Sequence, residues 1–138
     1  MLAKNDLKTL SQARIEDAII LYKAGKSSSA YYLAGYSIEL AIKVCISDLF
    51  QGGVIPDKGL VIATYSHDLE KLMNTAGLKP ALQEKEREDA QFSAYWGIVC
   101  KWSEQSRYTI TDPISAAHLL TSIQDQEHGV LQWLKQQW

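Results

Sequence analysis

Cysteine is scarce in this chain of 138 residues, and the two that occur, Cys45 and Cys100, stand far apart. Neither has the CxxC spacing, or the spaced Cys and His residues, of a zinc site or a redox motif. Each lies within an apolar run, so we interpret both as small residues of the core. The sequence also lacks a glycine-rich phosphate loop, a cluster of metal ligands and a nucleophile triad. We therefore expect no metal and no cofactor.

A surplus of basic residues is missing as well. The chain has 14 Lys and Arg against 16 Asp and Glu, a formal charge of -2, and a pI of about 5.9. Proteins that bind nucleic acid through general basicity carry a positive surplus. Any binding of nucleic acid would therefore use a local basic site.

Long apolar segments are absent too. The first six residues lack the apolar core of a signal peptide, and no helical segment offers the run of about 20 mostly apolar residues that a membrane span needs. We expect a cytoplasmic protein with no membrane insertion.

No segment alternates polar and apolar residues with the period of two that marks a strand. Apolar residues recur instead at spacings of three and four, which is typical of helices packed on one side. A chain of this length can bury a sizeable core without help from disulfides or metal. The sequence predicts an all-α protein with a single domain spanning residues 1–138.

Capping residues and breakers divide this pattern into helices. Gly25 suits the left-handed end of the first helix, and Thr111 or Asp112 precedes Pro113 at the first position of the last helix. The only long connection is expected between residues 54 and 64. The helices are expected at about 6–23, from the serines at 27–29 to 50, at 67–75, 80–102 and 113–138. Together they predict an up-and-down bundle of four long helices plus one short helix.

Residues 30–46 are apolar almost all round, as in a helix at the centre of a core. Within this run Glu39 and Lys43 are four residues apart and lie on one helix face. Arg14 falls inside the apolar stripe of the first helix and offers Glu39 a bidentate partner. We favour a structural polar core of Arg14, Glu39 and Lys43; a role for Glu39 in a functional site is the alternative.

Several short segments, taken in order, carry a resemblance to a known family. They are ARIEDA (13–18), AYYLAGY (30–36), ELAIK (39–43), SHDL (66–69), WS (102–103) and SRY (106–108). Their order and spacing, over nearly the whole chain, resemble the HEPN domain of prokaryotes. The resemblance implies an all-helical and often dimeric domain. It also implies a place beside a nucleotidyltransferase or in toxin–antitoxin and phage-defence systems, and in many relatives metal-independent cleavage of RNA.

Catalytic HEPN domains carry an arginine followed, four to six residues later, by a histidine. The histidine transfers a proton and the arginine stabilises charge on the phosphate. The histidines of this chain are His67, His118 and His128, and none follows an arginine at that distance. We interpret His118 as solvent-exposed and His128 as an ordinary residue beside the core. The departure predicts poor cleavage of RNA or none.

A rearranged site is the alternative, with His67 and Arg107 as the catalytic pair. Tyr65, Trp102 and Tyr108 would then contact RNA, with Trp102 or Tyr65 stacking on a base and Tyr108 beside Arg107. The structural interpretation is favoured. It makes His67 a residue of a helix's first turn, paired with its neighbour Asp68 or with a backbone group, and it makes Arg107 a residue that closes a loop against carbonyls or an acid.

Two classes of function remain open. One is an RNA-associated or RNA-cleaving HEPN protein, such as a toxin or a defence effector. The other is a non-catalytic helical module that forms a homodimer and binds a nucleotidyltransferase or an antitoxin. The exposed aromatic and apolar surface expected of a small bundle favours a homodimer.

Overall fold

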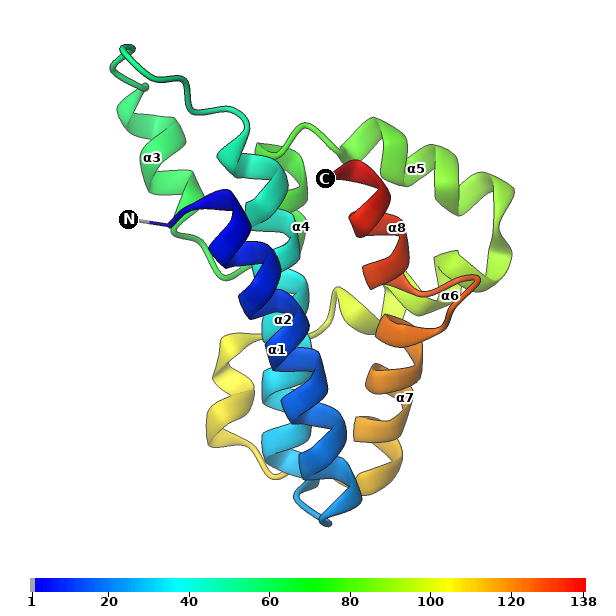
Figure 1. Cartoon of the computed structure of the whole chain (residues 1–138). Coiled ribbons are helices and arrows are strands. Elements are labelled where there is room, and N and C mark those ends of the chain that lie inside the picture. Colours follow the sequence, from blue (N-terminus) through cyan, green and yellow to red (C-terminus); the bar gives the residue numbers. More distant parts are fainter. Residues whose placement is uncertain (1) are drawn as a thin grey trace.

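Helix α2 (Ser27–Ser47) is the centre of the computed structural model, which describes residues 2–138. Most of its residues are buried, as its nearly all-round apolar sequence predicts. Helix α1 lies along one side of it, and α7 and α8 cover another (Figure 1). The 3-10 helix η1 and helix α4, which are distant from α2 in sequence, also pack against it.

The all-α prediction is confirmed, because residues 2–138 hold α-helices and one 3-10 helix and no strand. The elements are α1 (Lys4–Lys23), α2 (Ser27–Ser47), α3 (Lys58–Thr64), α4 (Leu69–Thr75), α5 (Lys79–Glu88), α6 (Ala90–Val99), η1 (Glu104–Tyr108), α7 (Pro113–Gln124) and α8 (Val130–Gln137). The expected division into four long helices and one short helix is not confirmed. Within residues 2–138, no helix is both long and apolar enough to cross a membrane.

Helices α1 and α2 form a closely packed antiparallel pair. Gly25, with φ of 79°, follows α1 and turns the chain, as its sequence position predicts. The buried Ser11 hydroxyl donates a hydrogen bond to the Ser37 carbonyl at 2.8 Å, which joins the two helices halfway along. Small residues at this contact allow the backbones to approach.

The helix expected at residues 80–102 is two helices. Asp89, with φ of -137° and ψ of 96°, leaves the helical conformation between α5 and α6. Its carboxylate accepts a hydrogen bond from the Phe92 amide at 2.9 Å and so caps the start of α6. The break separates the charged α5 from the apolar α6, and α6 ends at Val99, before Trp102.

The helix expected at residues 113–138 is also two helices. Asp112 caps α7 by accepting a hydrogen bond from the Ser115 amide at 2.8 Å, in agreement with the sequence. The chain then leaves the helix at Asp125, whose carboxylate accepts hydrogen bonds from the amides of Glu127 and His128. After this turn the chain continues into α8, and Trp138, which follows α8, donates a hydrogen bond to the Ala41 carbonyl of α2 at 3.2 Å.

The connection expected at residues 54–64 contains the short helix α3. It buries none of its residues and projects beside the N-terminal end of α1 (Figure 1). Its apolar side chains Ile62 and Tyr65, and Ile55 in the preceding loop, are exposed. A helix this short has little stability of its own.

Candidate functional site

His67 lies between two carboxylates that come from distant parts of the chain. Its Nδ1 atom is 2.8 Å from the Glu39 carboxylate on α2, and its Nε2 atom is 3.2 Å from the Glu104 carboxylate on η1. The imidazolium form can donate a hydrogen bond to both acids, whereas the neutral ring can donate to only one. The cluster therefore joins α2, η1 and the turn before α4 through one ring.

The Glu39 carboxylate is the buried end of this cluster, with only 2% of its side chain exposed. Its second oxygen accepts a hydrogen bond from Lys43 Nζ at 3.3 Å, which confirms the pairing predicted from their spacing on α2. A buried carboxylate needs such partners because leaving water costs several kcal/mol per ion.

Arg14 does not take part in this cluster, and its predicted pairing with Glu39 is wrong. Its guanidinium donates to the Asp17 carboxylate at 2.8 Å on the same helix, with about a third of its side chain exposed. The face of α1 that packs inward carries Ser11, Ile15 and Ala18 instead. Arg14 lies beside that face, where a neighbouring acid is closer than Glu39.

His67 also differs from its structural interpretation in the sequence. It precedes α4, whose N-cap is Asp68, and it is held by Glu39 and Glu104 rather than by Asp68. The Ser66 hydroxyl accepts a hydrogen bond from the Asp68 amide and shapes this turn. The turn presents the His67 ring to α2 on one side and to η1 on the other.

Aromatic rings form one wall of the site. The Tyr36 ring centroid is 6.3 Å from that of His67, 5.9 Å from that of Trp102 and 5.5 Å from that of Tyr32. Burial, and then the nearby charge of Glu39, raise the pKa of the Tyr36 phenol, so it stays protonated and can donate a hydrogen bond.

Trp102, a candidate for base stacking, has a packing role in this structure. Only 3% of the residue is exposed, and its indole lies against Gly35 of α2. Its Nε1 atom is buried and has no hydrogen-bond partner within residues 2–138. No face of the ring is open to a nucleotide base in this conformation.

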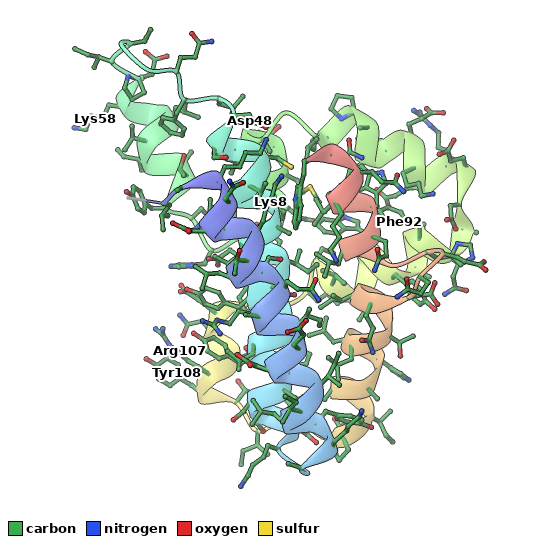
Figure 2. The ribbon with its side chains drawn as sticks, in the orientation of Figure 1. Lys8, Asp48, Lys58, Phe92, Arg107 and Tyr108 are labelled. Carbon is green, nitrogen blue, oxygen red and sulfur yellow. The ribbon has the colours of Figure 1, made fainter. Side chains whose placement is uncertain are left out.

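Arg107 and Tyr108 occupy the outer side of η1. Figure 2 shows both side chains pointing away from the bundle, and the Arg107 guanidinium carbon lies 4.8 Å from the centre of the Tyr108 ring. Interaction with the Tyr108 side chain raises the pKa of Arg107, which stays charged. Neither ring nitrogen of His67 pairs with Arg107, since each faces a carboxylate. From the sequence, Arg107 was expected to close a loop by binding carbonyls or an acid. In the structure its guanidinium instead lies over the Tyr108 ring.

Tyr65 lies elsewhere, at the C-terminal end of α3. It is 66% exposed, and Tyr108 is 75% exposed. The two tyrosines are available to a ligand, but they belong to separate elements, and Tyr65 lines a different cavity from His67. The structure therefore does not gather the candidate RNA contacts around His67.

A shallow cavity of about 310 Å³ opens beside His67. Its acidic lining residues are Asp68, Glu70 and Glu104, and His67 is its one basic lining residue. Carboxylates at this density repel a phosphate and attract hydrogen-bond donors. Among its described lining residues the cavity has no arginine or lysine that could stabilise charge on a phosphate.

Comparison with known proteins assigns this chain to no family. No family model matches the chain, and neither a curated protein nor a solved structure matches it significantly.

The structure contains a second, partly buried acid–histidine contact that the sequence did not predict. Asp89, between α5 and α6, accepts a hydrogen bond from His128 in the turn before α8, with Nδ1 and Oδ2 2.8 Å apart. Bonds from His128 and the Phe92 amide lower the pKa of Asp89 to about 2. The same contact raises the pKa of His128. His118 is exposed, as expected.

Both cysteines are free thiols. Cys45 is buried, in agreement with its interpretation as a core residue, and Cys100 is half-buried. Burial raises the pKa of the Cys45 thiol to about 11 and also raises that of Cys100. Within residues 2–138 no group of three His, Cys, Asp or Glu side chains is placed to hold a metal ion.

Proposed function

We propose that this chain is a HEPN-like helical protein of toxin–antitoxin or defence type that associates with RNA and does not cut it efficiently. The family assignment rests on the resemblance of the sequence segments, and the all-helical fold agrees with it. The functional part rests on one observation: both ring nitrogens of His67 face carboxylates.

That observation bears directly on catalysis. A general acid or base must reach the proton that it transfers, within hydrogen-bond distance. In this site Glu39 and Glu104 occupy both directions in which the His67 ring can donate or accept. Arg107 points outward on η1. The arginine that would stabilise charge on the phosphate and the histidine that would transfer the proton are therefore not held together at one site. The rate enhancement of about 10²–10⁴-fold that general acid–base catalysis provides is then missing.

RNA association is assigned to the outer face of η1. Arg107 offers a cation for a phosphate, and the exposed ring of Tyr108 offers a surface for a base. One cation gives a weak interaction that depends little on salt, because each phosphate contact releases about one counterion. The acidic cavity beside His67 keeps the phosphate chain away from the histidine.

Cleavage is tested with a mixed RNA pool and four proteins: the wild type, His67→Ala, Arg107→Ala and Glu104→Gln. We expect no cutting above background in any of them, with helical content unchanged by circular dichroism. Robust cutting by the wild type that is lost in His67→Ala and Arg107→Ala would instead establish a metal-independent ribonuclease with a rearranged site. Glu104→Gln removes a charge beside His67 and would alter such cutting.

Association is tested with a fluorescent single-stranded RNA and anisotropy. Arg107→Ala and Tyr108→Ala are expected to weaken binding by about fivefold to tenfold or more, since a stacked base contributes about 1–3 kcal/mol. Arg87→Ala on α5 is the matched control, because it removes another exposed arginine, one that pairs with Glu84. Equal binding by all four proteins would contradict the assignment of η1.

A second candidate function is partner binding, favoured by the exposed apolar residues. One group surrounds α3 and another lies between η1 and the start of α7. Surfaces of this kind suit a homodimer or a protein partner such as a nucleotidyltransferase or an antitoxin. The exposed residues are Val54, Ile55, Ile62 and Tyr65 in the first group and Tyr108, Ile110 and Ile114 in the second.

Light scattering over a concentration series tests the homodimer. A mass of twice the monomer is expected, and Ile55→Ser or Ile110→Ser should shift the equilibrium toward the monomer if its patch lies at the interface. A strict monomer at high concentration would exclude the homodimer and leave only a different protein as partner.

A further inference from the structure

A second cavity, remote from the outer face of η1, lies between the start of α1, the end of α2 and α3. Its volume is about 240 Å³. Leu7 of α1, Val61 of α3 and Phe50, in the connection just after α2, supply apolar walls. Lys43 also lines it and is the only charged residue to do so among those described. An apolar cavity with a single cation is suited to a ligand that is apolar along its length and anionic at one end.

The Lys43 ammonium has unused hydrogen-bonding capacity. Its side chain is 8% exposed, and within residues 2–138 its one side-chain bond is the 3.3 Å contact with Glu39. An ammonium group carries three N–H donors. Two donors on a buried cation therefore lack a partner in the protein, which is costly unless water or a ligand accepts their hydrogen bonds.

The aliphatic hydroxyl groups of the cavity cannot replace Lys43 as donors. The Ser47 hydroxyl donates to the Val44 carbonyl, and the Thr64 hydroxyl donates to the Leu60 carbonyl at 2.8 Å. Their protons are used within their own helices, which leaves Lys43 and the phenol of Tyr65 as donors. Tyr65 is 66% exposed, so Lys43 is the buried and charged donor of the cavity. A carboxylate has two oxygens, and these can accept hydrogen bonds from the two free N–H donors of Lys43.

We propose that this cavity binds a small monocarboxylic acid with a short hydrocarbon chain. The carboxylate lies against Lys43, and the hydrocarbon chain lies along Leu7, Phe50 and Val61. A phosphate fits less well, because its charge of nearly two calls for more than one cation and the remaining walls are largely apolar. The binding step involves no covalent chemistry and does not depend on RNA.

Octanoate is the probe, and 1-octanol is its uncharged counterpart. Binding to the chain of 138 residues is followed by ¹H–¹⁵N chemical shifts of residues around the cavity. Octanoate is expected to bind about tenfold more tightly than 1-octanol, because its carboxylate accepts charge-assisted hydrogen bonds from Lys43. Lys43→Met is expected to remove this preference.

Two further variants make the result independent of the buried ion pair. Val61→Trp fills the cavity without changing Lys43 or Glu39, and it is expected to abolish octanoate binding even if Lys43→Met fails to fold. Lys71→Met, at another cavity, is expected to bind octanoate like the wild type. Equal affinity for octanoate and 1-octanol, no saturable shifts with octanoate, or undiminished octanoate binding by Val61→Trp would each overturn the proposal.

Discussion

The indole of Trp102 occupies the space into which a side chain on Gly35 would project. Gly35 lies in the interior of α2, where glycine costs a helix about 1 kcal/mol relative to alanine. The glycine is explained by the segment just before η1, where Trp102 approaches α2 closely. This approach brings Glu104 within reach of His67.

Gly35→Ala is therefore expected to destabilise the protein. Overpacking of this kind costs about 1–3 kcal/mol, which exceeds the gain in helix propensity. Gly97→Ala on α6 is the matched control, because open space surrounds that position, and it should raise stability by up to about 1 kcal/mol. Urea unfolding measures both. A Gly35→Ala variant as stable as the wild type would contradict the tight contact with Trp102.

The buried position of Glu39 leads to a second prediction. Glu39→Ala leaves Lys43 without its carboxylate and is expected to lower the free energy of unfolding by about 3–5 kcal/mol. Arg14→Ala, which removes only a partly exposed pair with Asp17, should cost less than about 1 kcal/mol. Denaturant unfolding of the two variants compares them directly. Similar losses in both would mean that Arg14 also supports the core.

The contact between Asp89 and His128 predicts a pH dependence of stability. The pKa of His128 is raised above 6.5. Its contribution to the stability of the folded state is therefore present in full below pH 6.5 and is lost as the pH rises through the raised pKa. Because the pKa of Asp89 is lowered to about 2, its contribution is present above the ordinary value of 3.8 and is lost as the pH falls through about 2.

Melting temperatures between pH 5.5 and 8.5 test the histidine's part. The wild type is expected to lose stability with rising pH, and His128→Gln should show a flatter profile. His118→Gln is the matched control, since His118 is exposed, and it should follow the wild type. Asp89→Asn, which can still cap α6, should flatten the profile like His128→Gln. Parallel profiles for the wild type and His128→Gln would rule out the contribution.

The two thiols are expected to differ in reactivity. With a pKa of about 11, roughly one Cys45 in a thousand is a thiolate at pH 8, and the residue is buried. A maleimide at pH 8 should therefore modify Cys100 first in the folded protein, and Cys100→Ser should remain nearly unlabelled until denaturant is added. Mass spectrometry of the intact chain measures the labelling. Rapid labelling of Cys100→Ser would show that Cys45 is accessible.

Local patterns in the sequence predicted the parts that depend on neighbouring residues. The three- and four-residue spacing of apolar side chains gave the all-α class, and Gly25 and Asp112 marked real helix ends. The spacing of Glu39 and Lys43 gave their buried pair, because residues four apart on a helix face the same side.

The helix breaks at Asp89 and Asp125 were not predictable in the same way. Both residues stand in stretches whose composition suits a continuous helix. The Asp89 carboxylate caps the start of α6, and the Asp125 carboxylate accepts backbone hydrogen bonds in the turn after α7. His128 then pairs with Asp89 across the two breaks. The choice between a straight helix and a bend depends on packing against the rest of the chain, which local propensity does not contain.

The sequence by itself determined a helical protein with a central apolar helix and one acid–base pair inside it, because periodicity and i,i+4 spacing are properties of short segments. Only the tertiary structure decided that His67 meets Glu39 and Glu104, that Arg107 faces outward, and that Trp102 packs on α2. These contacts join segments that are distant along the chain. Their geometry follows from how the helices pack around α2, and no spacing in the sequence specifies it.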